Sequence, residues 1–269
     1  MSPEEPMKKH ICLFDMDGTL TEPRKKIKKD MIDSLKRLSD YVDIGIVTGS
    51  DFDYVEQQCF DMFGIGGVDP SRVRIFPCNG TKEYKWSGNK YELVSSVDMI
   101  DTIGQESYSK ILKALLSNQL IITIAHNLPF TGTFFQYRGS LLNWCPVGRS
   151  AGDVERAAWI AMDASQNIRD HWIENLKEMF NDYGIDVTAA LGGSTSFDIY
   201  PNGWDKTYVI NHLDEQEPFF IGDKCQEGGN DKALYDLLVA DKMGFETSST
   251  SETQEIIENI INKVSKDVK

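Results

Sequence analysis

The sequence predicts an α/β fold in which a core built on a parallel sheet is interrupted by an inserted α+β module. Apolar runs at residues 11–14, 44–47 and 218–221 each end in polar residues, as buried strands of a parallel sheet do. Apolar residues recur at helical spacing over residues 27–42, so strand, helix and strand form a right-handed βαβ unit. From about residue 90 to residue 200 strands and helices stop alternating strictly, which indicates a separate module.

The elements expected in this module follow from apolar spacing and from alternation along the chain. They are a helix containing residues 111–116, a strand at 120–125, alternating residues within 132–147, helices at 153–165 and 167–180, and a strand at 194–200. A last helix, with an apolar face from Ile256 to Val264, is expected to begin at a capping box of Ser251 and Gln254 and to pack into the core. Residues 1–88 and 203–269 are therefore assigned to the core, and residues 89–202 to the module.

The composition is that of a globular protein with an acidic surface. The 269 residues are 41% hydrophobic and carry a formal net charge of −14. This charge disfavours nucleic acid and anionic membranes as partners, although a few arginines can still hold a small anionic substrate. Residues 1–10 are charged and lack the apolar core of a signal peptide, and no apolar run approaches the ~20 residues that span a membrane. Its five cysteines are scattered without a C-x-x-C pair, so a reducing compartment and a cytoplasmic location are expected.

Two carboxylates at the end of the first predicted strand form the most informative motif. Asp15 and Asp17 are two residues apart on an extended segment and point the same way, and Gly18 lets the chain turn away. Open α/β sheets bind ligands at this end of their strands. Such a pair can bind Mg²⁺, and one carboxylate can be a covalent nucleophile while the other transfers a proton. An EF-hand loop is excluded, because its sixth and twelfth positions hold Leu20 and Lys26.

Polar residues stand at three further places where the site is expected. Thr48 and Ser50 follow the second strand and offer a hydroxyl and helix-start amides to phosphate oxygens. Lys206 comes just after the inserted module, and Asp223 follows a later strand. Because the carboxyl ends of parallel strands share one edge of a sheet, these residues are expected to meet the two carboxylates in one site.

In this order the four elements resemble the haloacid dehalogenase superfamily of aspartyl-phosphate phosphotransferases. The chain is similar in particular to the eukaryotic phosphomannomutase family. The motifs that carry this closer resemblance are LFDMDGTLT at 13–21, GSDF at 49–52, GTFFQYR at 132–138, LLNWCPVGRS at 141–150, SFDIYPNGWDK at 196–206 and FIGDKCQEGGND at 220–231. The resemblance implies a Rossmann-like core of the haloacid dehalogenase type and makes the inserted module an α+β cap domain.

The resemblance also implies a role for each candidate residue. By this resemblance Asp15 stands at the position of the family's nucleophile and Asp17 at that of its acid/base. Lys206 stands at the position of the residue that stabilises the aspartyl-phosphate. It implies that Mg²⁺ is held by Asp15, a backbone oxygen of Asp17, and Asp223, and that Thr48 and Ser50 bind phosphate. The substrate-binding positions of the family fall on Arg24, Arg138, Arg149, Arg156, Ser196 and Asp198.

By this resemblance the protein is expected to interconvert mannose 6-phosphate and mannose 1-phosphate, with a hexose 1,6-bisphosphate as activator. Its product would supply GDP-mannose synthesis. The resemblance is also compatible with glucose phosphates as further hexose phosphate substrates. A homodimer through the cap domain is expected, because family members commonly pair in this way.

Two alternatives stay open: a sugar-phosphate phosphatase on the same scaffold, and a non-catalytic scaffold protein. The phosphatase is kept open by residues 139–145, where Trp144 and Cys145 stand at positions usually held by small or aliphatic residues. Thr48 also departs from the family pattern, which usually has glycine there. The segment after Asp231 is longer than that pattern, so no ligands of a second cation site are assigned.

Overall fold

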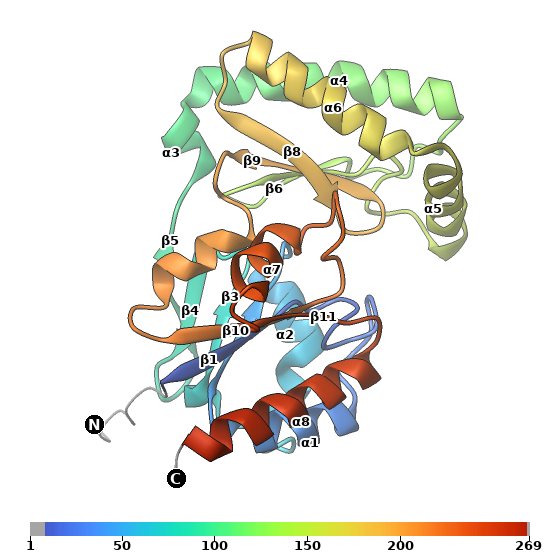
Figure 1. The fold of residues 1–269 in the computed structure, drawn as a ribbon. Coiled ribbons are helices and arrows are strands. Elements are labelled where there is room, and N and C mark those ends of the chain that lie inside the picture. Colours follow the sequence, from blue (N-terminus) through green and yellow to red (C-terminus); the bar gives the residue numbers. More distant parts are fainter. Residues whose placement is uncertain (1–8, 268–269) are drawn as a thin grey trace. The chain divides into compact units, whose positions relative to one another are not determined.

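The computed structural model describes residues 9–267 of the chain, which form two compact units (Figure 1). One unit consists of residues 9–96 and 206–267, and the other is Val97–Asp205. These limits differ from the predicted divisions at residues 88/89 and 202/203. Residues 91–96 stay in the first unit because they pair with the preceding strand of its sheet. Trp204 stays in the second unit because it packs against that unit's apolar core.

A seven-stranded sheet organises the first unit. Its strands are β1 (His10–Phe14), β2 (Asp43–Val47), β3 (Val73–Phe76), β4 (Lys82–Trp86), β5 (Tyr91–Ser96), β10 (Glu217–Gly222) and β11 (Gly244–Glu246). Their order is β11-β10-β1-β2-β3-β4-β5, with parallel pairing from β11 to β3 and antiparallel pairing of β4 with both neighbours. The predicted parallel core is confirmed. Its apolar runs do not predict the β4–β5 hairpin, whose residues are mostly exposed or half-buried.

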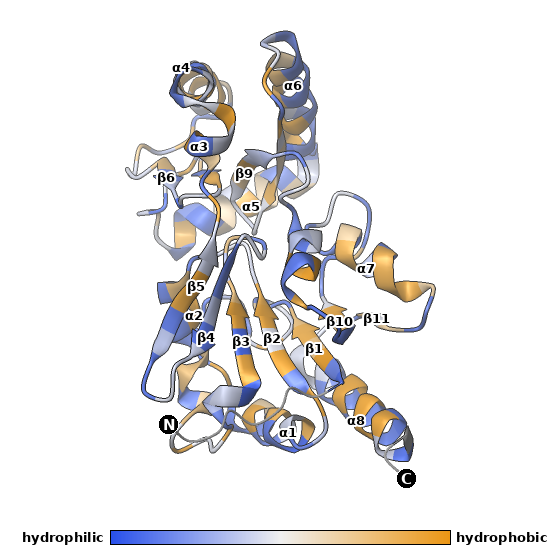
Figure 2. Ribbon diagram, turned by 90° about the vertical axis from the view of Figure 1, so that its left-hand side faces the viewer, coloured by the Kyte–Doolittle hydropathy of each residue, from blue (hydrophilic) through white to orange (hydrophobic). Residues whose placement is uncertain are grey.

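Helices cover both faces of this sheet (Figure 2). Successive residues of β1 point to opposite faces: Cys12 and Phe14 enter one apolar cluster, and Ile11 and Leu13 enter another. The first cluster includes residues of α1 (Lys29–Ser39), α2 (Phe52–Cys59) and α8 (Thr250–Asp267); the second includes residues of the 3-10 helix η3 (Lys206–His212) and of α7 (Lys232–Val239). Two short 3-10 helices are η1 (Phe60–Met62) and η2 (Pro70–Arg72).

The second unit is an α+β module. Its strands β6 (Phe135–Tyr137), β7 (Leu142–Trp144), β8 (Val187–Gly192) and β9 (Ser196–Pro201) form an antiparallel sheet in the order β6-β7-β9-β8. Its helices are α3 (Met99–Ile103), α4 (Gln105–His126), α5 (Asp153–Gln166) and α6 (Ile168–Asp182). Aromatic side chains fill its core, where Trp144 stacks on Phe197 with ring centroids 4.7 Å apart. Trp144 therefore has a packing role in this core.

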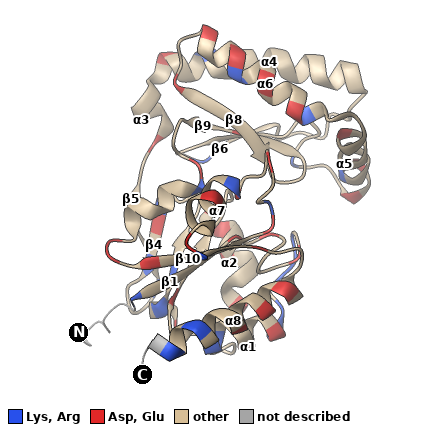
Figure 3. Cartoon of the chain, in the orientation of Figure 1, with Lys and Arg blue, Asp and Glu red and all other residues tan. Residues whose placement is uncertain are grey.

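The predicted strand at residues 120–125 is wrong, because these residues continue helix α4. The β-branched isoleucines and Thr123 favour a strand locally, but the buried stripe of the helix, with Leu115 and Ile122, runs through this segment. Beyond Lys113, α4 carries no Asp, Glu, Lys or Arg, as the uncoloured second half of this helix in Figure 3 shows. Its exposed side is therefore apolar rather than charged.

The predicted capping box of α8 is also wrong. Ser249, not Ser251, caps the helix: its Oγ accepts from the amide of Glu252 at 3.2 Å. The carboxylate of Glu252 in turn accepts from the amide of Ser248 at 2.7 Å, so the reciprocal arrangement lies closer to the start of the helix. None of the helices in the described part of the chain has the length and apolar character needed to cross a bilayer.

Candidate active site

The catalytic candidates of the first unit gather where β1 ends. Asp15 continues this strand, since its amide donates to the carbonyl of Ile221 in β10 at 2.9 Å. Gly18 then turns the chain with a φ of +95°. A Cβ on Gly18 would lie 2.3 Å from Oδ2 of Asp223, so only glycine lets this carboxylate come so close. The neighbouring strands β1 and β10 thus bring Asp15 and Asp223 together.

A buried lysine joins two carboxylates at this point. Lys206, the first residue of η3, is fully buried, and its Nζ donates to Oδ1 of Asp15 and, at 2.5 Å, to Oδ1 of Asp231. The other oxygen of Asp231 accepts from the amide of Lys224 at 3.0 Å. Asp231 therefore fixes both the lysine and the loop that follows β10.

Burial and the neighbouring charges together set the pKa values of Asp15 and Lys206. Burial raises the pKa of Asp15 to about 7; the ammonium of Lys206 opposes this rise, and the carboxylates of Asp231 and Asp223 add to it. Burial alone would lower the pKa of Lys206, but the two carboxylates that it contacts outweigh burial and raise it. Lys206 is therefore a cation at neutral pH, surrounded by more carboxylates than it can neutralise.

The oxygen atoms at this site fit a hard divalent cation such as Mg²⁺. Oxygens of Asp15, Asp223 and Asp231 lie within 4.8 Å of one another. Oδ1 of Asp223 and Oδ1 of Asn230 are buried and have no hydrogen-bond partner among the described residues, so their lone pairs can serve a cation. Carboxylate and amide oxygens are the ligands that Mg²⁺ prefers. The carboxylate of Asp17 lies outside this group of oxygens. The sequence-based prediction makes the backbone oxygen of Asp17, not its carboxylate, a ligand of Mg²⁺.

The carboxylate of Asp17 has partners of a different kind. The hydroxyl of Tyr54, in the first turn of α2, donates to Oδ1 at 3.1 Å and to Oδ2 at 3.2 Å. The amide of Arg24 donates to Oδ1 at 3.1 Å, from an exposed loop in which Arg24 has a φ of +63°. Asp15 thus pairs with an ammonium while Asp17 accepts from neutral groups. Such a difference in surroundings suits two carboxylates with separate roles.

Thr48 and Ser50 follow β2 at the same edge of the sheet. The side chain of Thr48 is buried, and its Oγ1 accepts from the amide of Ser50 at 3.2 Å. Asp51 then caps helix α2 by accepting from the amide of Tyr54 at 3.3 Å. The two residues thus lead directly into the start of a helix, where backbone amides and the helix dipole favour anions.

A second polar cluster surrounds Asp198 of β9, within the second unit. Burial raises the pKa of this carboxyl, while Arg138, the amide of Asn143 and Arg149 oppose the rise. Asn143 connects the cluster: its Nδ2 donates to Oδ1 of Asp198 at 2.7 Å, and its Oδ1 accepts from Arg149 at 3.1 Å. A Cβ on Gly192 would lie 2.9 Å from the same oxygen of Asp198. Two predicted arginines therefore surround one predicted carboxylate and leave a net positive charge.

Arg156 contacts the turn between β8 and β9. Its guanidinium donates to Oγ1 of Thr195 at 3.2 Å and to Oγ of Ser194 at 3.4 Å. The indole of Trp159 donates to the carbonyl of Thr195 at 3.1 Å. Arg156 and Trp159 share helix α5, so this helix and the turn hold one another in place.

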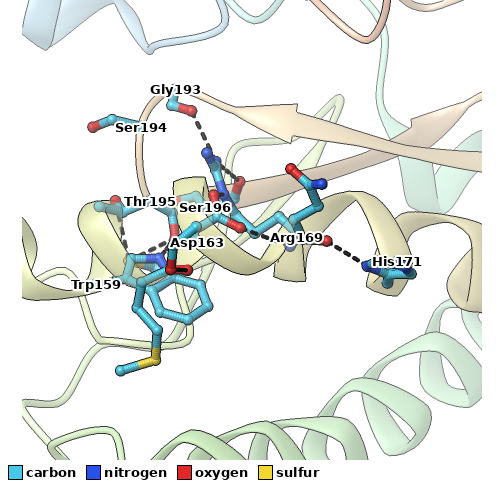
Figure 4. Close-up of polar contacts among 12 residues, drawn as sticks. Trp159, Asp163, Arg169, His171, Gly193, Ser194, Thr195 and Ser196 are labelled. Atoms are coloured by element: carbon cyan, nitrogen blue, oxygen red, sulfur yellow. Dashed lines mark hydrogen bonds and ion pairs between the residues drawn. The ribbon is translucent and has the colours of Figure 1, made fainter.

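The same turn is anchored by a buried ion pair (Figure 4). Arg169 of α6 contacts Asp163 of α5 at 2.6 Å, and one nitrogen of its guanidinium donates to the carbonyls of Gly193 and Ser196 at 2.9 Å and 3.1 Å. Hydrogen bonds to charged donors are stronger than neutral ones, so this arginine fixes the backbone at the start of β9. Arg169 thus holds the backbone of Ser196. The described hydrogen bonds of Arg169 reach no other predicted site residue.

The candidate residues therefore fall into two groups. The first unit contains Asp15, Asp17, Arg24, Thr48, Ser50, Lys206 and Asp223, and the second contains Arg138, Arg149, Arg156, Ser196 and Asp198. Asp231, Tyr54 and Asn143 contact these residues directly but are absent from the predicted set. Asp231 shares a polar run with Asp223, which is a usable sequence signal. Asn143 also carries such a signal, because it lies with Arg149 in the motif at 141–150, whereas Tyr54 lies outside the quoted motifs.

Comparisons with known proteins identify the family of this chain. The family model of eukaryotic phosphomannomutase matches residues 31–263. The chain belongs to the eukaryotic phosphomannomutase family. A phosphomannomutase of Schizosaccharomyces pombe is 34% identical over 264 residues, which cover 96% of this chain and 97% of that protein. Phosphomannomutase 2 of Dictyostelium discoideum is 36% identical over 227 residues, with 83% and 86% covered.

Solved structures similar to this phosphomannomutase-family chain include two phosphatase-type proteins. IMP-bound IMP-nucleotidase of Plasmodium falciparum aligns with a TM-score of 0.67 and 14% identity, over 95% of this chain and 68% of that one. A trehalose-6-phosphate phosphatase related protein aligns with a TM-score of 0.54 and 14% identity, over 95% and 99%. At these identities the likeness shows the fold alone, and it confirms the predicted fold of the haloacid dehalogenase type. The prediction of an enzyme, an isomerase of the phosphomannomutase family, is also confirmed.

Proposed function

We propose that this member of the family interconverts mannose 6-phosphate and mannose 1-phosphate through an aspartyl-phosphate. Asp15 is the nucleophile and Asp17 is the acid/base. The observation that supports this assignment is the different surroundings of the two carboxylates: a buried ammonium contacts Asp15, and neutral donors contact Asp17. The ammonium of Lys206 opposes the effect of burial on Asp15 and so favours the ionised form that a nucleophile needs. The proton transfer is assigned to Asp17, whose carboxylate accepts hydrogen bonds from neutral donors.

The chemistry of the proposed reaction balances within these groups. A carboxylate oxygen of Asp15 bonds to the phosphorus of a hexose 1,6-bisphosphate, and the bond from phosphorus to the sugar oxygen breaks. Asp17 gives its proton to that oxygen. In the second half of the reaction a hydroxyl oxygen of a hexose monophosphate bonds to the phosphorus of the aspartyl-phosphate, and the bond from phosphorus to Asp15 breaks. The carboxylate of Asp15 is thereby restored, and Asp17 takes the proton of the hydroxyl. Lys206 remains charged throughout and stabilises the phosphorylated form of Asp15.

Asp15, a backbone oxygen of Asp17, and Asp223 would hold Mg²⁺, which would supply positive charge to offset the repulsion between carboxylate and phosphate. Thr48 and Ser50 bind oxygens of the reacting phosphate. Guanidinium binds phosphate through two parallel hydrogen bonds, so Arg24 of the first unit and, in the second unit, Arg138, Arg149 and Arg156 are each assigned to substrate binding. Ser196 and Asp198 bind the hexose.

These arginines favour a mutase over a phosphatase. A simple phosphatase needs one phosphate site, whereas a mutase must retain a bisphosphate and present either end of it to Asp15. The cluster around Asp198 contains two guanidinium groups and one carboxylate, so it is suited to a second phosphate. Retaining the bisphosphate also keeps water from hydrolysing the aspartyl-phosphate.

The nucleophile is tested by Asp15→Asn, which keeps the shape of the side chain and removes its nucleophilic oxygen. Incubation with a ³²P-labelled hexose 1,6-bisphosphate and acid quenching should label the wild-type protein and leave this variant unlabelled and inactive. Full activity of the variant at matched purity would exclude the covalent mechanism. Labelling on another residue would move the nucleophile elsewhere.

The proposed product, mannose 1-phosphate, would supply GDP-mannose synthesis for glycosylation, and glucose phosphates are proposed as secondary substrates. We place this activity in the cytoplasm. The five cysteines support that location, because all are buried and free, as expected in a reducing compartment. A GDP-mannose shortage in cells that lack the protein would be the corresponding cellular observation.

We also propose a homodimer through the second unit, with the exposed side of α4 in the interface. Leu116, Leu120 and Ile124 are each more than half exposed and recur at helical spacing, with Ile121 beside them. A charge-free apolar surface of this kind is typical of a protein–protein interface. Sedimentation should show a dimer for the wild type and a monomer for Ile124→Glu, whereas a glutamate at exposed Leu237 of α7 should leave the dimer intact.

A further inference from the structure

Tyr54 occupies a position that connects two parts of the site in the first unit. Its amide is held by the carboxylate of Asp51 at 3.3 Å, at the start of α2. Its hydroxyl donates to both carboxylate oxygens of Asp17, at 3.1 Å and 3.2 Å. Its ring is partly buried against the core of the unit. One side chain thus ties the end of the β1 motif to the helix that follows Thr48 and Ser50.

The hydroxyl of Tyr54 is a permanent donor. A phenol has an ordinary pKa of about 10, so the hydroxyl keeps its proton and donates at physiological pH. The other described hydrogen bond to the carboxylate comes from the amide of Arg24, which reaches Oδ1 only. Among the described residues, Oδ2 of Asp17 accepts from Tyr54 alone. The orientation of this carboxylate therefore depends on the phenol.

We propose that Tyr54 is a positioning residue for Asp17, holding its carboxylate in the orientation from which it exchanges a proton with the sugar oxygen. The inference rests on the proposed function, because it assumes that Asp17 is the acid/base. When the bond from phosphorus to the sugar oxygen breaks, the proton passes from Asp17 to that oxygen, and Tyr54 retains its own proton. A hydrogen bond donated to the carboxylate also stabilises the ionised Asp17 that this transfer leaves.

The variant Tyr54→Phe removes the hydroxyl and keeps the ring, so the packing against the core is preserved. With hexose 1-phosphate, Mg²⁺ and hexose 1,6-bisphosphate, kcat should fall about tenfold, the effect of one charge-assisted hydrogen bond. KM should stay within about twofold, because the phosphate-binding groups are untouched.

A matched control is Tyr91→Phe. The hydroxyl of Tyr91 donates to the carbonyls of Pro70 and Val73 at 3.0 Å and 3.3 Å. The ring of Tyr91 packs against those of Phe52 and Phe60. Its hydroxyl has no described hydrogen bond to a site residue. Its loss should lower the melting temperature and leave kcat unchanged. A purely structural effect of Tyr54→Phe would resemble this control.

The leaving group provides a second readout. An aryl phosphate such as 4-nitrophenyl phosphate releases an oxyanion that needs no proton, so its first-turnover burst of nitrophenolate should be the same in wild type and Tyr54→Phe. Equal slowing with both phosphoryl donors, or an unchanged kcat with hexose 1-phosphate, would overturn the positioning role. The variant Asp17→Asn tests the proposed acid/base separately from the role of Tyr54. If Asp17→Asn remains active, the proposed acid/base fails; if it is inactive while Tyr54→Phe is normal, only the role of Tyr54 fails.

Discussion

Lys206 and Asp231 form a fully buried ion pair, with Nζ and Oδ1 2.5 Å apart, and the same ammonium contacts Asp15. Two buried charges lose much hydration free energy. The partners that each charge has in this cluster offset that loss. Asp231 also accepts from the amide of Lys224, which ties the loop after β10 to the lysine of η3. The proposed nucleophile, Asp15, therefore shares its lysine with a residue that the predicted site omits.

We expect Asp231→Asn to reduce kcat by at least about a hundredfold, the loss typical of a buried charge pair at a catalytic centre. The amide group would face an ammonium and leave Lys206 with one carboxylate instead of two. Stopped assays at saturating substrate measure the effect. Asp236→Asn is the matched control, because Asp236 forms an exposed pair with Lys232 four residues earlier on α7, and its activity should equal that of the wild type.

The metal-free protein should lose stability as pH rises from about 4 to about 7. The ordinary pKa of an aspartate is near 4, whereas burial raises that of Asp15 to about 7. In this window the folded protein binds a proton that the unfolded chain has released, so the free energy of unfolding falls as pH increases. Thermal melts in EDTA should show this slope for the wild type and a smaller one for Asp15→Asn.

The same melts test the cation. Mg²⁺ should raise the melting temperature more at pH 8 than at pH 5, because it binds the ionised form of Asp15. A stabilisation by Mg²⁺ that is equal at both values, or that persists undiminished in Asp15→Asn, would contradict the assignment of this cluster as the metal site.

Arg149→Ala should weaken the binding of substrate and bisphosphate while leaving the melting temperature nearly unchanged. The side chain is exposed, and its hydrogen bond to Asn143 at 3.1 Å lies at the edge of the cluster around Asp198. We expect KM to rise about tenfold or more, as for the loss of a charged hydrogen bond to phosphate. Arg37→Ala, which removes an exposed pair with Glu258, is the control. Substrate titrations identical to wild type would make Arg149 an ordinary surface residue.

Arg74 and Glu83 should contribute strongly to the stability of the first unit. Both are buried; Nε of Arg74 donates to Glu83 at 2.8 Å, and another nitrogen of the guanidinium donates to Gln216 at 3.0 Å. Arg74→Met leaves Glu83 without this partner and should lower the free energy of unfolding by about 3–5 kcal/mol. Arg37→Met, at an exposed pair, should change it by less than about 1 kcal/mol. Urea denaturation followed by circular dichroism measures both values.

Much of the fold follows from local patterns in the sequence. The buried strands around Cys12 and Ile46 are continuous apolar runs, and the parallel core that they predict is present. The segment at residues 120–125 misleads, because its residues favour a strand whereas the preceding helix extends through them. Strands β4 and β5 are equally hard to predict, because a half-exposed hairpin lacks a long apolar run.

The candidate site shows a similar division. Asp15 and Asp223 could be predicted, because strand ends of a parallel sheet converge regardless of what lies between them in sequence. The contacts of Tyr54 and Asn143 could not, because they depend on side-chain orientation across elements that no spacing rule connects. Lys206 was found through its motif, but its full burial and its pairing with Asp231 are properties of packing around η3.

The central claim is that the enzyme retains a bisphosphate and returns a phosphoryl group to the sugar. It is tested most directly by ³¹P NMR of the protein with mannose 1-phosphate and Mg²⁺, in the presence and absence of a hexose 1,6-bisphosphate. We expect mannose 6-phosphate to form much faster than free phosphate and the bisphosphate to increase its rate of formation. If free phosphate dominates and the bisphosphate has no effect, the chain is a phosphatase and the proposed mutase reaction is wrong.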